Sequence, residues 1–152
     1  MKSKGFTLVE LTVVLAIVGV LAAILVPTLM GYVKKTRLKT ANANAKTVYN
    51  VVAEAVADID ANEGSIDWTA AIGTYNGSVQ TTGLNDNFAR TVYSVLSPNG
   101  SKAGEVYIGN HRFGNTDGFF VHWRESADNI IGQYPQAIQS TNSNVNWENF
   151  YE

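Results

Sequence analysis

An acidic side chain, Glu10, stands at the beginning of a strongly apolar segment near the N-terminus. Residues 11–33 carry no charge, and about 20 helical residues are enough to cross the hydrocarbon core of a membrane. An acid near the centre of a membrane helix costs up to about 3 kcal/mol, and less near an end. The carboxylate of Glu10 therefore needs a partner, which could be a cation or the free N–H groups at the start of its own helix.

No group of residues in the sequence forms a recognisable catalytic motif. The chain lacks the Gly-x-Ser-x-Gly, P-loop, Rossmann and His-x-x-x-His patterns. It also has no cysteine, which excludes disulfides, thiol catalysis and thiolate metal sites. His122 alternates with Trp123 on a predicted strand, so we expect this histidine on the sheet surface. The sequence predicts neither an enzyme nor a cofactor.

A calcium ion is bound in proteins by several oxygen ligands. They could come from Asn115, Asp117, Asp128 and Asn129. The same residue types favour turns through local hydrogen bonds, which is a sufficient reason for their position between predicted strands. We therefore predict no metal site.

The charges are unevenly distributed along the chain. Lys2 and Lys4 precede the apolar segment, and four cations between residues 34 and 39 follow it. From residue 47 onward, four basic residues stand against twelve acidic ones, which leaves a net charge of −8. A body with this charge would repel a phosphate backbone, so we do not expect it to bind nucleic acid directly. The basic downstream flank alone would place that end of the segment in the cytoplasm.

A long helix must carry the apolar segment and extend beyond it. After residue 33, apolar residues recur in steps of three and four, which is typical of an amphipathic helix: Leu38, Ala41, Ala45, Val48, Val52, Ala55, Val56 and Ile59. With Gly64 as the stop signal, the sequence predicts one helix over 6–63, roughly 85 Å long at 1.5 Å per residue. Gly19 and Pro27 weaken this helix, and we expect a kink at the proline.

The remainder of the chain predicts a small mixed body. Short helices are expected over 65–73 and 85–97, with a turn at Asn76-Gly77 between them. The polar residues 139–146 are expected to be irregular.

Three strands are expected over 105–113, 118–124 and 129–137. Their short connections make the pairing antiparallel, and one face of the sheet must cover the apolar stripe of the helix. A last turn over 147–151 is expected to dock on the body. The fold class is therefore α+β, with a long N-terminal helix, half apolar and half amphipathic, packed on a small antiparallel sheet.

Residues 4–10 read KGFTLVE, and this stretch with the apolar helix behind it resembles the prepilin cleavage motif of type IV pilins and of the related type II secretion pseudopilins. The likeness includes a short basic leader, Gly5 before the cut, Phe6 after it and an acid at the fifth mature position. Gly19 and Pro27 fall where many of these pilins carry a glycine and a proline. The resemblance covers residues 1–33. A secretory signal peptide or a plain signal anchor is the alternative, but the segment is long for the first and contains Glu10.

The resemblance implies three parts: a leader over 1–5, an apolar helix over 6–33 and a globular body over 34–152. A prepilin peptidase, an aspartyl protease of the membrane, would cut between Gly5 and Phe6 on the cytoplasmic side, and the new amine of Phe6 would be N-methylated. The apolar helix would stay on the product. This topology is opposite to the one that the flanking charges favour, and we follow the family.

In the resembled family, the acid is thought to meet the N-terminal amine of a neighbouring subunit. Glu10 would then set the axial register, because a slipped helix leaves both charges unpaired in an apolar filament core. The alternative is that Glu10 only caps its own helix or assists processing. Filaments of the family also often contain a melted helix segment, and we expect it between Gly19 and Pro27.

The function that the resemblance implies is that of a structural subunit of a type IV pilus. The processed protein would span the cytoplasmic membrane once and then polymerise through its helix into a surface filament for adhesion, motility or DNA uptake. Its partners would be other copies of itself, the prepilin peptidase, the pilus assembly platform and the lipid bilayer. The alternatives are a type II secretion pseudopilin and a minor tip pilin that acts as an adhesive module.

Overall fold

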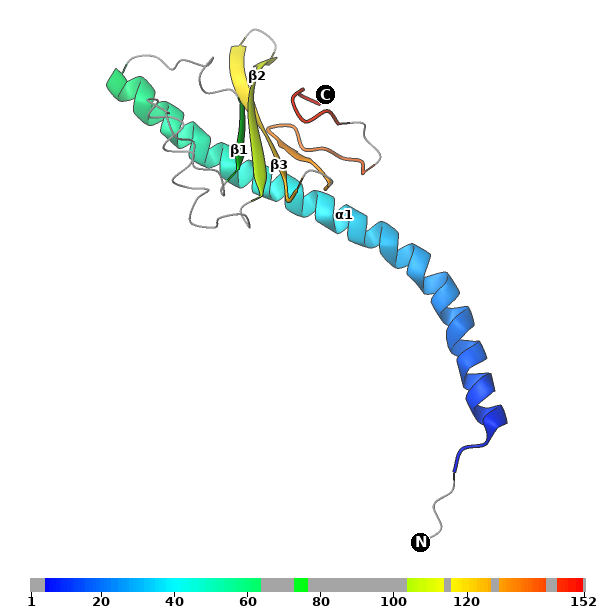
Figure 1. The fold of residues 1–152 in the computed structure, drawn as a ribbon. Coiled ribbons are helices and arrows are strands. Elements are labelled where there is room, and N and C mark those ends of the chain that lie inside the picture. The colour runs from blue at the N-terminus through cyan, green and yellow to red at the C-terminus, as the bar shows by residue number, and fades with distance from the viewer. Residues whose placement is uncertain are drawn as a thin grey trace. The chain divides into compact units, whose positions relative to one another are not determined.

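The computed structural model of the chain describes residues 5–63, 73–76, 104–113, 116–126, 129–141 and 145–151. These parts form one helix, α1 (Leu8–Glu63), and four strands, β1 (Gly73–Asn76), β2 (Glu105–Phe113), β3 (Thr116–Arg124) and β4 (Gly132–Tyr134) (Figure 1). The predicted α+β class is confirmed. The chain divides into two compact units, residues 1–36 and residues 37–152.

The first unit contains the apolar part of α1. The helix is continuous through Gly19 and Pro27, so neither residue interrupts it in the subunit. Directly after the proline, the hydroxyl of Thr28 donates a hydrogen bond to the carbonyl of Leu25 at 2.8 Å. Within the described residues, α1 is the one helix long and apolar enough to cross a membrane.

The sheet lies in the second unit, where the strands follow the order β1-β2-β3-β4 and every pair is antiparallel, as predicted. β2 has the predicted bounds, and β3 begins at Thr116 instead of residue 118. β4 covers only Gly132–Tyr134 of the predicted strand 129–137. Pro135 follows at once, and a proline has no N–H group with which to continue a ladder.

Strand β1 was not predicted. Gly73 was expected to end a helix and Asn76 to begin a turn, but residues 73–76 pair with β2 instead. The strand signal is weak because only two of its four residues favour strands, and of these Tyr75 is buried. The other residues of the predicted helix 65–73, and all of the predicted helix 85–97, lie outside the described residues.

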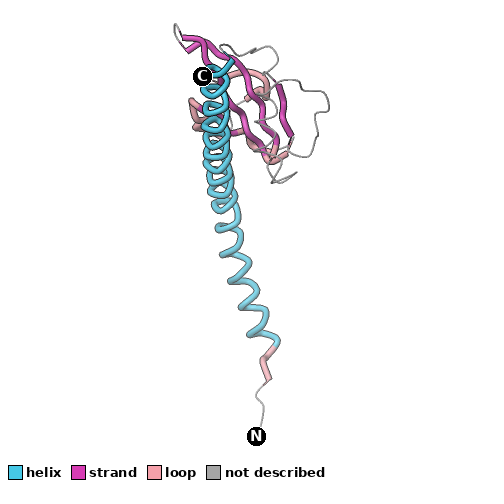
Figure 2. Tube along the Cα trace, turned by 90° about the vertical axis from the view of Figure 1, so that its left-hand side faces the viewer, coloured by secondary structure: helices cyan, strands magenta, loops and turns pink. Residues whose placement is uncertain are grey.

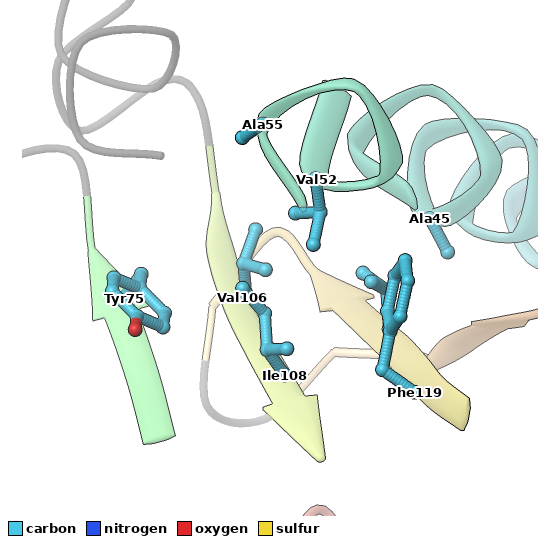
Figure 3. Packing of buried hydrophobic residues seen from close by; sticks show 8 residues of the cluster. Ala45, Val52, Ala55, Tyr75, Val106, Ile108 and Phe119 are labelled. Atoms are coloured by element: carbon cyan, nitrogen blue, oxygen red, sulfur yellow. The ribbon is translucent and has the colours of Figure 1, made fainter. Parts of the chain in front are cut away.

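The hydrophobic core lies between one face of the sheet and the second half of α1. Figure 2 shows the strands beside this half of the helix, and Figure 3 shows the side chains that meet there. The buried cluster joins helix residues to strand residues: Ala45, Val52, Ala55, Tyr75, Val106, Ile108, Phe119 and Val121. The prediction that the sheet covers the helical stripe is therefore confirmed. Tyr49 adds a stacked contact on Phe119, with ring centroids 4.3 Å apart.

Strand β4 comes very close to the backbone of α1 at Gly132. A Cβ atom at this position would collide with the backbone carbonyl of Ala41 and the backbone nitrogen of Asn42. The side chain of Asn42 fastens the same contact: its Oδ1 accepts from the backbone N–H of Gln133 at 3.0 Å, and its Nδ2 donates to the carbonyl of Ile138 at 2.8 Å. A glycine is therefore required at position 132 by packing alone.

The prediction that His122 lies on the sheet surface is wrong, because its side chain is completely buried. Strand alternation correctly places it on the face opposite Val121, but the C-terminal residues cover that face. The ring nitrogens of His122 lie 2.8 Å from the carbonyl oxygen of Trp147 and 2.7 Å from Oε1 of Gln133. Burial lowers the pKa of His122, and these two contacts oppose the shift because they favour a proton on the ring.

The C-terminal segment 145–151 docks on the outer face of the sheet, which confirms the predicted contact of the last turn with the body. Phe150 stacks on His111 with centroids 4.0 Å apart, and the guanidinium of Arg124 lies 4.0 Å from the ring centroid of Trp147. Both polar side-chain atoms of Gln133 bond to the backbone of Tyr151. Oε1 accepts from the N–H of Tyr151 and Nε2 donates to its carbonyl, each at 2.7 Å. With no cysteine in the chain, these noncovalent contacts hold the segment in place.

Candidate functional site

The start of α1 is closed by reciprocal hydrogen bonds between Thr7 and Glu10. The backbone N–H of Thr7 donates to Oε2 of Glu10 at 2.8 Å, and the backbone N–H of Glu10 is 3.3 Å from Oγ1 of Thr7. The Thr7 hydroxyl also donates to the same carboxylate oxygen at 2.8 Å. This arrangement is a capping box, in which the residue before the helix and the third helical residue each satisfy a backbone N–H that the helix leaves free.

The capping box uses only one of the two carboxylate oxygens of Glu10. Both hydrogen bonds from Thr7 end on Oε2. Among the described residues, no hydrogen bond to Oε1 is found, and the side chain is exposed. Glu10 can therefore cap its own helix and still offer an oxygen to a cation outside the subunit.

The predicted cleavage position lies just before this cap, in backbone that is not helical. Gly5, Phe6 and Thr7 precede α1 and are exposed, Phe6 by 87%. A Cβ atom added at Gly5 would meet no other atom within 4 Å. The fold of the subunit thus gives no reason for a glycine at position 5, in contrast to position 132.

The surface of α1 behind the cap is apolar on all sides. Every large apolar side chain from Phe6 to Val33 is at least 45% exposed. Fully burying one such side chain stabilises a structure by about 1.5–3 kcal/mol. The segment must therefore be covered by lipid or by other protein.

The other predicted site residues lie in the helix or in a local turn, or they fall outside the described residues. Gly19 and Pro27 lie within the continuous helix α1, with open space around Gly19. Of the calcium candidates, Asn129 donates its side-chain amide to Ser126 Oγ at 2.8 Å, which is a local turn contact. Asn115, Asp128 and the side chain of Asp117 lie outside the described residues. In the part of the chain that is described, no group of three or more His, Cys, Asp or Glu side chains could hold a metal ion.

Thr7 is the residue of this site that the sequence interpretation missed. The pattern Thr-x-x-Glu directly before an apolar run is a signal of a helix start, and it was present as Thr7-Leu8-Val9-Glu10. The predicted helix start at Phe6 was two residues early for the same reason, because the structure begins α1 at Leu8.

Comparisons with known proteins match the N-terminal residues and much of the remaining chain. The family described as Prokaryotic N-terminal methylation motif matches residues 1–26. A type IV major alpha-pilin of Moraxella bovis is 35% identical over 117 residues, which cover 67% of this chain and 72% of that protein. The type IV major fimbrial protein FimA of Dichelobacter nodosus is 36% identical over 69 residues, covering 45% of this chain and 44% of that protein.

A third relative matches over a shorter stretch of the chain. The type IV major pilin protein PilA of Myxococcus xanthus is 40% identical over 48 residues, which cover 32% of this chain and 22% of that protein. No solved structure matches the chain. The methylation motif and the alignment that spans most of both this chain and the Moraxella protein show that the chain belongs to the type IV pilin family.

Proposed function

We propose that this pilin is made as a precursor, cut between Gly5 and Phe6, N-methylated on Phe6 and polymerised with other copies of itself into a type IV pilus. Before assembly, residues 6–33 hold it in the cytoplasmic membrane, and afterwards the same residues form the filament core around which the bodies, residues 34–152, are arranged. The chemistry is done on the chain by a prepilin peptidase and a methyltransferase activity, and the chain itself is a structural protein and not an enzyme. The assembly platform moves it from the membrane into the filament.

The observation that carries this proposal is the apolar surface of α1 next to an acid with a free oxygen. An apolar surface with no charge between residues 11 and 33 suits both lipid and a core of packed helices. Cleavage before Phe6 creates an ammonium group at the end of that surface. Oε1 of Glu10 in one subunit can accept from the Phe6 ammonium of the next, while Oε2 stays in the capping box. The two roles considered for Glu10, capping and register, are therefore compatible.

A valine at position 5 tests the processing step. Because a side chain at this position meets nothing in the subunit, Gly5→Val should leave the fold unchanged and block only the peptidase. We expect full-length precursor to accumulate in the membrane and filaments to be lost. Mass spectrometry of wild-type filaments should find a methylated Phe6 at the N-terminus of the main subunit. Gly31→Val is the matched control, since Gly31 is also surrounded by open space, and it should be cut normally. An N-terminus at Met1 in assembled subunits, or one after Ala22 or Ala23, would overturn the proposal.

The segment between Gly19 and Pro27 tests the change from membrane to filament. In lipid this part of α1 must satisfy its own backbone hydrogen bonds, and in the subunit it is helical. In a filament, surrounding protein makes non-helical backbone tolerable, and the helix should yield where a glycine and a proline weaken it. We expect an extended stretch that ends near Pro27. Each residue gains roughly 1.8 Å in length on going from helix to extended chain, so the stretch should lengthen the subunit by about 13 Å. A filament reconstruction with continuous helix over residues 22–26 would contradict this expectation.

A further inference from the structure

We propose that Thr7 is a positioning residue for precursor cleavage: its capping box with Glu10 fixes the start of α1 at Leu8 and thereby holds the Gly5–Phe6 peptide bond in non-helical backbone at a constant distance from the membrane helix. This inference rests on the proposed function, since it concerns the same cleavage. It assigns a role to a side chain that lies on the product side of the cut and is not itself part of the bond that breaks.

The position of the helix start matters because a helical peptide bond is a poor substrate for a protease. In a helix, the backbone groups are bonded to one another and the side chains surround them. Proteins that bind a peptide backbone commonly take it as an extended strand, which can offer its N–H and C=O groups to the partner. Gly5 and Phe6 lie outside the helix in the subunit: they precede α1 and are exposed.

The capping box is what separates this exposed stretch from the helix. The carbonyl of Thr7 accepts the first helical hydrogen bond, from the N–H of Leu11 at 3.3 Å, while its N–H is taken by Glu10 at 2.8 Å. If α1 began one residue earlier, the N–H of Glu10 would have to bond to the carbonyl of Phe6, but this N–H is directed to Oγ1 of Thr7 at 3.3 Å instead. The apolar residues on both sides of the boundary would otherwise leave no local signal for where α1 begins.

The environment of Gly5 is an independent indication that another protein binds this stretch. A side chain at position 5 would meet nothing within 4 Å in the subunit. The glycine is therefore not needed for packing, and its lack of a side chain is of use only to a partner that approaches the backbone closely. The capping box presents the adjacent bond to that partner.

The reaction itself is hydrolysis of one peptide bond. Water adds to the carbonyl carbon of Gly5, the bond from this carbon to the nitrogen of Phe6 breaks, and the nitrogen takes up the proton. The products are a leader with a carboxylate on Gly5 and a mature chain with an ammonium group on Phe6. Thr7 takes no part in these bond changes, and it acts only through the position of the bond.

The test compares Thr7→Val with Thr7→Ser in the full-length precursor, incubated in membranes with prepilin peptidase. Valine keeps the branched shape and removes the hydroxyl, so two of the three hydrogen bonds of the capping box are lost, while serine retains all three. We expect the initial rate of cleavage after Gly5 to fall about fivefold in Thr7→Val, the factor that corresponds to the loss of a typical helix cap of about 1 kcal/mol. Thr7→Ser should be cut at close to the wild-type rate.

Thr12→Val is the matched control. Thr12 lies on the same apolar helix, and its hydroxyl only bonds back to the carbonyl of Val9 at 3.0 Å. This variant should be cut normally. Backbone chemical shifts of residues 5–8 in detergent should show a moved helix boundary in Thr7→Val and an unchanged one in the other two variants.

The outcomes separate this inference from the proposed function. If the wild-type chain is not cut after Gly5, the proposed function fails. If the wild-type chain is cut and Thr7→Val is cut equally fast, or if Thr7→Ser and Thr12→Val are slowed as much as Thr7→Val, cleavage occurs but Thr7 does not position it. A slow Thr7→Val with normal Thr7→Ser and Thr12→Val, together with a moved boundary, supports the inference.

Discussion

Filaments are expected to disappear when Glu10 is replaced by glutamine, although the subunit is still cut and its body still folds. An amide oxygen can accept from Thr7 as the carboxylate does, so the helix cap is kept. The negative charge is lost, however, and the ammonium group of Phe6 in the neighbouring subunit is left without its partner. Removing one member of a buried ion pair costs about 3–5 kcal/mol, because the remaining charge stays in an apolar environment.

This cost is large for a polymer, since every added subunit bears it. A loss of about 3 kcal/mol weakens each addition by more than a hundredfold. Electron microscopy and the amount of sheared surface protein measure the result, and mass spectrometry of the membrane fraction shows whether Phe6 is still the first residue. Glu54→Gln makes the same chemical change at an exposed position in the second half of α1 and should leave filaments at wild-type levels.

The opposite result would change the role of Glu10. Normal filaments in Glu10→Gln would mean that the cap, which this variant keeps, is the whole function of the side chain. Glu10→Ala would then be the variant that fails, because alanine removes the cap and the charge together. The two substitutions therefore separate a role within the subunit from a role between subunits.

Patterns confined to one element could be predicted from the sequence. The three- and four-residue steps from Leu38 to Ile59 gave the face of α1 that packs on the sheet, and this face is buried at Ala45, Val52 and Ala55. The bounds of β2, between clear turn signals, were also predicted without error. The helical signal repeats several times along α1, so a single unusual residue does not hide it.

Contacts between elements distant in sequence could not be predicted in this way. His122 was placed on the correct face of β3, but alternation does not tell what covers a face. The cover comes from Trp147, 25 residues later, and from Gln133 on the neighbouring strand. Strand β1 had too few residues to show a period at all. Thr7 is a different case, because its partner is three residues away and the local pattern was sufficient to find it.

The body of the pilin is expected to lose a large part of its stability when Gly132 is replaced by alanine. The added methyl group would overlap the backbone of α1 at Ala41 and Asn42, and backbone cannot rotate away as a flexible side chain can. Strand β4 must therefore move away from the helix, which breaks both hydrogen bonds of the Asn42 side chain. Overpacking in a core costs about 1–3 kcal/mol, and each unsatisfied buried polar group adds about 1–3 kcal/mol. A loss of about 3–5 kcal/mol would be a large part of the stability of a small domain.

The same substitution at Gly31 provides the matched control for this loss. Gly31 lies in α1 with open space around it, so Gly31→Ala should leave the unfolding of the body unchanged. Unfolding can be followed in the full-length protein in detergent by the fluorescence of Trp123 and Trp147, which lie on the sheet and in the segment that covers it. Asn42→Ala separates the contribution of the lost hydrogen bonds from that of the collision, because it removes only the hydrogen bonds. This variant should cost about 1–3 kcal/mol. A Gly132→Ala protein no less stable than Asn42→Ala would show that β4 can shift along α1 without strain. The greater loss expected from Gly132→Ala follows from the contact being backbone against backbone.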